Sequence, residues 1–180
     1  RRPRLSKPAA MAHSRALSRT SGGRALASDT TIEKTRLGKT ALTVSRICYG
    51  TAPIGNMPEV YGHGITEDEA SRTVRAVLNG PSNFMDTSRN YGAGRSEQRA
   101  GKVIRAIGVP EGFVISTKLD RDPETNRFDA SAMRRSFEQS LEALGVDRVQ
   151  LLHLHDPEYA ADLEEVTKPG GGLAELYKIR

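Results

Sequence analysis

Four residues of types that often work in active sites each lie at or just after the end of a predicted strand. A short apolar strand ends at Asp86, and Tyr91 follows five residues later in the next loop. The next two predicted strands run into Lys118 and His155. Parallel strands in α/β folds bring their carboxyl ends to one edge of the sheet, where active sites are assembled. We therefore expect these four side chains to share one site.

The four residue types together suit proton transfer at an oxygen atom that gains or loses charge. A tyrosine with an ordinary pKa near ~10 is a slow acid or base at neutral pH unless a cation lies beside it. Lys118 could supply that cation, and Asp86 would keep the ammonium charged and directed at Tyr91. His155 could donate a hydrogen bond that orients and polarises the substrate oxygen. Each residue taken singly also has an ordinary structural interpretation, but their joint placement at successive strand ends favours a site.

The elements that must position these residues alternate along the chain, which predicts repeated βα units and a parallel sheet. A three-layer open sheet is the competing fold, but the turn after the first strand lacks the Gly-x-Gly-x-x-Gly pattern of a dinucleotide-binding turn. The Gly- and Pro-containing loop over 52–64 is expected to be irregular. The predicted elements are a hairpin over 34–37 and 42–45, strands over 47–50, 84–86, 113–118 and 149–155, and helices over 66–78, 96–107, 129–144 and 172–180.

Three motifs, taken in order, resemble the N-terminal half of an aldo-keto reductase. They are Asp-Thr-x-x-x-Tyr-Gly-x-Gly-x-Ser-Glu at 86–97, Ser-Thr-Lys at 116–118 and Leu-His-Asp-Pro at 154–157. Within that family, Gly-Thr-Ala-Pro-Ile-Gly-Asn at 50–56 and the His-Asp-Pro sequence resemble the aldose (galactose, fucose or D-threo-aldose) 1-dehydrogenase branch. The resemblance implies a (β/α) TIM-barrel fold, of which residues 31–180 would form about four βα units, a half barrel preceded by a β-hairpin that closes its bottom.

The resemblance also implies an activity and a set of site residues. The expected enzyme is an oxidoreductase of carbohydrate metabolism that uses NADP or NAD and transfers hydride between nicotinamide and an aldose or another small carbonyl or alcohol. The choice between NAD and NADP stays open, because the family's adenosine and phosphate contacts lie mainly in later βα units. The residues that match the family are Asp86, Tyr91, Lys118 and His155 for catalysis, and Gly50, Thr51, Ala52 and Asp86 for the cofactor.

Two other classes of function remain as alternatives. Lys118 at a strand end could form a Schiff base in a lyase, but the neighbouring Asp86 argues against a neutral amine. The chain could also be a non-catalytic fragment or interaction module, because it is short for a barrel that typically needs ~250 residues. A half barrel would expose strand edges, so the isolated chain is expected either to be a marginally stable monomer or to self-associate through those edges, without dehydrogenase turnover.

The pair His153 and His155 could also suggest a metal site, with Asp156 nearby. No third ligand stands at convincing spacing, and zinc sites use three or four ligands, so no metal is expected. His155 is the predicted site residue, and His153 is expected to be hydrogen-bonded one layer deeper in the barrel. Arg89 and Asn90 depart from the small or apolar residues expected in the aldose branch, so Arg89 either favours an anionic substrate or is solvated.

Charge and composition exclude several classes of partner. The net charge is +5 over 180 residues, but residues 1–30 hold seven basic and one acidic side chain, 7 − 1 = +6, which leaves −1 for the rest. The body therefore has no basic groove for nucleic acid. No apolar run approaches the ~18 residues of a membrane span. The one cysteine, Cys48, suits a reducing, cytoplasmic location and is expected to be a small buried residue.

Residues 1–30 are rich in Arg, Ser, Ala and Gly and poor in large apolar side chains. Such a segment cannot form a packed core, so it is predicted to be a disordered basic tail. Its composition matches organelle transit peptides, but the chain does not begin with Met and has one at Met11. A segment translated upstream of the enzyme is an equal alternative.

Overall fold

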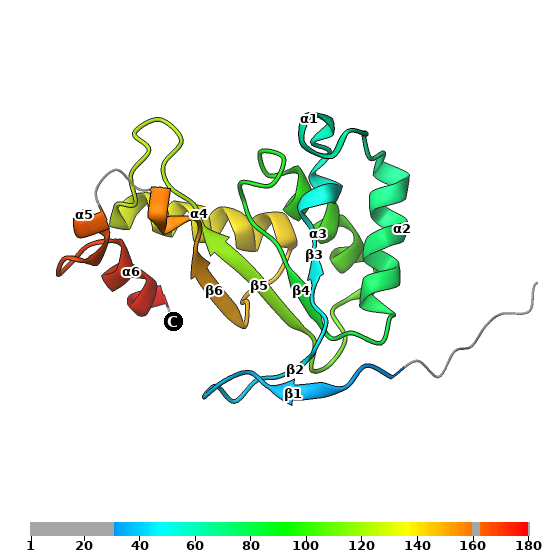
Figure 1. Cartoon of the computed structure of the whole chain (residues 1–180). Helices are drawn as coiled ribbons and strands as arrows, with labels where there is room; N and C mark the ends of the chain where they lie inside the picture. The colour runs from blue at the N-terminus through cyan, green and yellow to red at the C-terminus, as the bar shows by residue number, and fades with distance from the viewer. Residues whose placement is uncertain (1–30, 160–162, 180) are drawn as a thin grey trace, which may run out of the picture.

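The computed structural model describes residues 31–159 and 163–179, and its centre is a four-stranded parallel sheet (Figure 1). The strands lie side by side in the same order as along the chain, and all three pairings are parallel. Parallel neighbours need long crossovers, which here contain helices. The predicted parallel βα arrangement is confirmed, with strands β3 Tyr49–Gly50, β4 Phe84–Asp86, β5 Val114–Leu119 and β6 Leu151–Leu154.

Helices pack along one face of the sheet (Figure 1). Helix α3 packs against both α2 and α4, α4 packs on β5, and α6 packs on α4 and β6. The predicted capping box of the first long helix is present, because Thr66 and Glu69 each accept a hydrogen bond from the other's backbone N–H. The bounds are α2 Glu67–Leu78, α3 Arg95–Ile107, α4 Ala130–Leu144, α5 Leu163–Thr167 and α6 Gly172–Ile179.

Two apolar clusters fill the space between the sheet and these helices. One lies under α2 and α3 and includes Met85 and Ile115, which are 0% and 2% exposed. The other lies under α4 and α6 and includes Leu119 and Met133, both fully buried. Because side chains alternate along a strand, this packing leaves Asp86, Ser116 and Lys118 on the opposite, inner face.

A hairpin crosses the amino ends of the parallel strands, at the end of the molecule opposite to the strands' carboxyl ends (Figure 1). Its strands, β1 Lys34–Arg36 and β2 Thr43–Ser45, pair antiparallel as predicted. The Asn83 side chain fixes the hairpin to the sheet, because its Oδ1 accepts the N–H of Ser45 at 2.8 Å and its Nδ2 donates to the carbonyl of Thr43 at 3.0 Å. The hairpin therefore covers the bottom of the sheet and leaves the carboxyl ends open.

Three strands have bounds that differ from the sequence prediction. The first strand begins at Tyr49 and excludes Ile47, which is 55% exposed. The last strand excludes Val149 and His155. Both are edge strands with one neighbour, so their ends lose the pairing that defines a strand. The central β5 has a neighbour on each side and keeps the predicted length of six residues, but it runs from Val114 to Leu119, one residue later than predicted at each end.

The loop over 52–64, expected to be irregular, contains two short helices, η1 Ala52–Gly55 and α1 Pro58–Tyr61. Each has a proline in its first turn, where the missing N–H costs nothing. The sequence interpretation took those prolines as breakers. Helix α5 and the short η2 Pro157–Tyr159 were not predicted either.

The sequence pattern predicts an apolar stripe of Met133, Phe137, Leu141 and Leu144 on α4, and the structure buries Met133 and Leu144 fully. Ser136 and Ser140 are 6% and 0% exposed, whereas Phe137 and Leu141 are only partly buried. The buried hydroxyl of Ser136 accepts the backbone N–H of Asp120 at 3.0 Å. It therefore provides the hydrogen-bond acceptor for the backbone just past the carboxyl end of β5. Ile107, the last residue of α3, is 40% exposed.

The predicted basic tail, residues 1–30, lies outside the described residues. Within the described residues, no helix is long and apolar enough to cross a membrane.

Candidate active site

Lys118 lies at the centre of the predicted site and makes three hydrogen bonds. Its Nζ donates to Asp86 Oδ2 at 2.5 Å, to the backbone oxygen of Thr87 at 2.8 Å and to the hydroxyl of Tyr91 at 3.1 Å. The ammonium also lies 4.7 Å from the centroid of the Tyr91 ring. The structure therefore brings Asp86, Tyr91 and Lys118 together, as the strand-end placement predicts.

The direction of these hydrogen bonds decides what each group can do. An ammonium has three donors and no acceptor, so the Tyr91 oxygen accepts from Lys118 and its own proton is free to point elsewhere. Burial lowers the pKa of Lys118, but hydrogen bonds to Asp86 and Tyr91 outweigh it, so the pKa lies above its ordinary value. A charged Lys118 can stabilise a phenolate on Tyr91, and it is a poor nucleophile for a Schiff base.

Asp86 is held in place from both sides. Ser116 on β5 donates to its Oδ1 at 2.9 Å. In the sheet, Gly50, Asp86 and Ser116 are successive partners across three strands. Thr51 donates both its N–H and its hydroxyl to the Asp86 backbone oxygen, at 2.9 and 3.0 Å. The carboxylate therefore meets Lys118 from a fixed backbone position.

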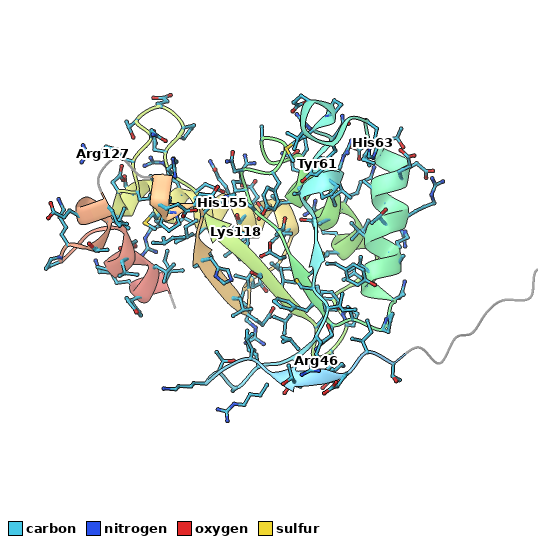
Figure 2. The ribbon with its side chains drawn as sticks, viewed as in Figure 1. Arg46, Tyr61, His63, Lys118, Arg127 and His155 are labelled. Atoms are coloured by element: carbon cyan, nitrogen blue, oxygen red, sulfur yellow. The ribbon has the colours of Figure 1, made fainter. Side chains whose placement is uncertain are left out.

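His155 joins the same group from the end of β6. Its ring packs edge to face against Tyr91, with centroids 5.5 Å apart. Its Nδ1 contacts the Asp120 carboxylate and lies 3.0 Å from the hydroxyl of Ser88. Figure 2 shows Lys118 and His155 side by side at the carboxyl ends of their strands, at the end of the sheet away from Arg46. All four predicted catalytic candidates thus meet in one place.

The motif over 86–97 divides into a chemical part and a supporting part. Gly92 has φ of +62°, and a β-carbon there would lie 2.0 Å from the Gly55 oxygen, so only glycine lets the Tyr91 loop approach η1 this closely. Ser96 donates to the carbonyl of Thr51 at 2.8 Å. Glu97, fully buried, accepts from Thr117 at 2.6 Å, and burial raises the pKa of its carboxyl. Only the first half of the motif reaches the site.

His153 does not occupy the predicted deeper, hydrogen-bonded position. His153 is the register partner of Lys118 in the neighbouring strand, and its side chain is exposed on the same inner face. It is exposed because no further strand covers β6 within the described part of the chain. No group of three metal-binding side chains occurs among the described residues. His153 is therefore an open inner-face residue in this structure.

Cys48 is exposed, which corrects the expectation of a buried residue. It directly precedes β3, an edge strand of the parallel sheet. Partial burial on its protein side, followed by the charge of Asp86, raises the pKa of the thiol to about 11. Cys48 is therefore a poor nucleophile at neutral pH.

A hollow of about 720 Å³ lies beside the four candidates and contains none of them. Arg89 and Asp120 contribute to its wall, together with one face of α4. Arg89 is half-buried, with its guanidinium against Gly94, so both alternatives given for it, an anionic substrate or solvation at the hollow, stay predictions. The loop and helix residues that line the hollow are Arg89, Asn90, Ala93, Asp120, Arg121, Asp122, Pro123, Glu124, Asn126, Ala132, Arg135, Ser136 and Gln139.

Three further residues touch the site and were assigned no role from the sequence. Ser116 binds Asp86, and Asp120 and Ser88 bind His155. Ser116 belongs to a Ser-Thr-Lys motif, and its alternation with Lys118 on β5 was a usable signal. Asp120 and Ser88 lie in loops, where side-chain direction has no period to read.

Comparisons with known proteins identify the family and agree with this fold. The model of the Aldo/keto reductase family matches residues 46–178. The chain is 40% identical to L-galactose dehydrogenase of Arabidopsis thaliana over 133 residues, which are 73% of the chain and 40% of that protein. It is 33% identical to D-threo-aldose 1-dehydrogenase of a Pseudomonas species over 141 residues, which cover 65% of the chain and 41% of that protein.

A solved structure of a putative aldo-keto reductase from Pseudomonas aeruginosa superposes with a TM-score of 0.68 at 29% identity, covering 87% of this chain and 59% of that chain. The chain thus spans about two fifths of the length of the two curated relatives, and the four parallel strands form part of a TIM barrel. The family model matches residues 46–178, which include the four parallel strands and the three motifs, so the chain belongs to the aldo-keto reductase family.

Proposed function

We propose that this chain carries the acid-base site of an NAD(P)-dependent oxidoreductase that transfers hydride between nicotinamide and an aldose or another small carbonyl or alcohol. The observation that carries the proposal is the triple hydrogen bond of Lys118 Nζ to Asp86, Thr87 and Tyr91. It provides a proton donor, a cation beside that donor and a carboxylate that keeps the cation charged.

In the direction of reduction, Tyr91 gives its proton to the carbonyl oxygen as negative charge develops there. The phenolate left behind lies 3.1 Å from the Lys118 ammonium, which stabilises it. Oxidation of an alcohol uses the same groups in reverse. His155, packed against the Tyr91 ring, contacts the substrate oxygen from the other side.

The cofactor, when bound, supplies or takes the hydride. We assign its nicotinamide end to Gly50, Thr51, Ala52 and Asp86. Gly50 is exposed, and a β-carbon there would meet no atom within 4 Å, so a flat ring has room beside the strand end. The Thr51 hydroxyl is already engaged with Asp86 and Ser96, so Thr51 contributes by placing Asp86. The proposal includes NADP and NAD alike.

The substrate proposal is an aldose oxidised at C1. It is supported by the names of the two curated relatives, L-galactose dehydrogenase and D-threo-aldose 1-dehydrogenase. A single cysteine cannot form a disulfide within the chain, which suits a reducing compartment, so a cytoplasmic location is part of the proposal. We also propose that the partner of the protein is a small-molecule substrate, and that it binds neither nucleic acid nor a membrane.

The test uses the protein expressed from the complete open reading frame that encodes this chain. Production of NADH or NADPH is followed with a panel of aldoses, including L-galactose, for the wild type and for Lys118→Met. We expect aldose-dependent turnover in the wild type and a loss of at least ~100-fold in the variant. Lys102→Met, on the exposed side of α3, is the matched control and keeps full turnover.

Three outcomes would count against the proposal. One is turnover of Lys118→Met within threefold of the wild type. Another is a covalent adduct at Lys118 after borohydride treatment with an aldose and no cofactor, which would favour the lyase alternative. The third is absence of turnover with both cofactors across the panel, which would favour a non-catalytic module.

A further inference from the structure

Arg89 differs from the other two arginines of the hollow because no acceptor meets it within the described part of the chain. Its Nε is buried there without a hydrogen-bond partner. Arg135, in contrast, pairs with Asp122 at 3.0 Å, and Arg121 donates to the backbone oxygen of Asp156 at 2.6 Å. Burying part of a guanidinium without a partner costs free energy. The Arg89 side chain is therefore a candidate group for binding an anion.

The surroundings of Arg89 do not balance its charge. A β-carbon on Gly94 would lie 1.5 Å from Arg89 Nη1, so the guanidinium lies against the residue that caps the amino end of α3. That end of a helix carries partial positive charge and gives a cation no support. The nearest acid of α3 is Glu97, whose Oε2 is also buried without a hydrogen-bond partner in the described chain. The two side chains therefore do not meet.

Two residues connect the hollow to the acid-base site. Asn90 lines the hollow and directly precedes Tyr91, and Asp120 lines the hollow and contacts His155. The volume of about 720 Å³ is large enough for a small ligand. The amides of Asn90 and Gln139 in its wall can both donate to and accept from sugar hydroxyls. A sugar in the hollow would thus lie one side chain away from His155.

We propose that Arg89 binds a carboxylate of the substrate, so that the substrate class is a sugar acid such as a hexuronate. The acid end of the sugar lies in the hollow, and C1 lies at Tyr91 and His155. This inference rests on the proposed function and deepens it. A guanidinium presents paired N–H donors that match the two oxygens of a carboxylate. The carboxylate takes no part in the reaction and fixes the orientation of the sugar.

The charges of the wall favour a carboxylate over a phosphate. Besides its three arginines, the hollow is lined by Asp120, Asp122 and Glu124. A phosphate monoester carries about −1.5 to −2 charges at neutral pH, so these acids repel it more strongly than they repel a single carboxylate. The hollow therefore fits an anion with one charge.

The test is isothermal titration calorimetry of the protein expressed from the complete reading frame. The probes are D-galacturonate and D-galactose, which differ at C6, where one has a carboxylate and the other a CH₂OH group. We expect galacturonate to bind at least ~10-fold more tightly, and we expect added salt to reduce this preference. D-Galactose 6-phosphate should bind more weakly than galacturonate.

Arg89→Gln should lower the ratio of the two affinities by at least ~10-fold. Arg75→Gln, in the exposed last turn of α2, is the matched control and should keep the wild-type ratio. Because both sugars are compared within one protein, a general loss of stability does not imitate the effect. If Arg89→Gln does not fold, the ranking of the three sugars by the wild type and its salt dependence decide.

Three results would overturn the inference. The first is equal affinity of the wild type for galacturonate and galactose, and the second is a preference that survives Arg89→Gln. The third is tighter binding of the phosphate than of the carboxylate.

The titration needs no turnover, so it fails separately from the proposed function. Binding of galacturonate through Arg89 by a protein that turns over no aldose with either cofactor would support the carboxylate site and reject the oxidoreductase. Oxidation of aldoses by a protein without this preference would do the reverse.

Discussion

The two faces of the parallel sheet meet different surroundings, and the chain divides its tasks between them. On the outer face, Met85, Ile115 and Leu119 pack under helices and are at most 2% exposed. On the inner face, Gly50 and His153 are exposed, and Asp86 and Lys118 lie between them. Burial of apolar area stabilises a fold, whereas reactive groups need access. Stability in this chain therefore comes from the outer face and chemistry from the inner one.

The inner face gives the largest expected effect. Its edges, β3 and β6, each have one partner strand in the described chain, and an unpaired edge can pair with another chain. We expect the isolated 180-residue chain to self-associate or to be a marginally stable monomer, with no dehydrogenase turnover. Size-exclusion chromatography with a cofactor-fluorescence titration measures both. A compact, cooperatively unfolding monomer that binds NAD(P)H at micromolar concentration would contradict this expectation.

The outer face gives the next largest effect, on stability. Met85→Ala removes a fully buried side chain and should lower the free energy of unfolding by about 2 to 5 kcal/mol. His153→Ala, on the exposed inner face, should change it by less than about 0.5 kcal/mol. Urea unfolding of the protein from the complete reading frame measures both. Equal losses would mean that the two faces share the work of stabilising the fold.

A smaller effect concerns the buried acid of the outer side, Glu97. Burial raises the pKa of its carboxyl above the ordinary value of 4.5, so the unfolded state releases this proton at a lower pH than the folded state. Stability should therefore fall as pH rises from 4.5 to the raised pKa and stay level above it. Glu97→Gln should remove that fall.

The Glu97 prediction is checked by urea unfolding at several pH values from about 4 to 8, as the difference between wild type and variant. Glu138→Gln, at an exposed position of α4, is the control and should leave the pH profile unchanged. Parallel profiles for wild type and Glu97→Gln would show that burial of this carboxyl has no linked cost.

The comparison also shows what a sequence can reveal. The positions of Asp86, Lys118 and His155 could be predicted because short apolar runs mark strands, and parallel strands bring their ends together. Those predictions needed no side-chain direction beyond the two-residue alternation of a strand. The strand-end positions of these three residues and the parallel βα arrangement therefore follow from local pattern and one rule of topology, whereas Tyr91 lies in a loop.

Other features depend on contacts that no local pattern contains. Asp120 binds His155 across 35 positions of the chain, and nothing in the Leu-Asp-Arg-Asp sequence around it signals an imidazole. Ser136 is buried on α4 and accepts the N–H of Asp120, and the apolar pattern of α4 gives no sign of this contact. His153 was placed in a deeper layer of a closed barrel, whereas β6 is an edge in the described chain.

The most direct test of the central claim is the turnover number of Tyr91→Phe. The protein from the complete reading frame is assayed with an aldose and either cofactor, beside the wild type and Tyr61→Phe. Tyr61 is 38% exposed on α1 and serves as the matched loss of a phenol hydroxyl. We predict that Tyr91→Phe lowers kcat by at least ~100-fold with unchanged folding, and that Tyr61→Phe keeps kcat within a factor of about two. A Tyr91→Phe protein that turns over within threefold of wild type would contradict the assignment of Tyr91 and Lys118 as the proton-transfer pair.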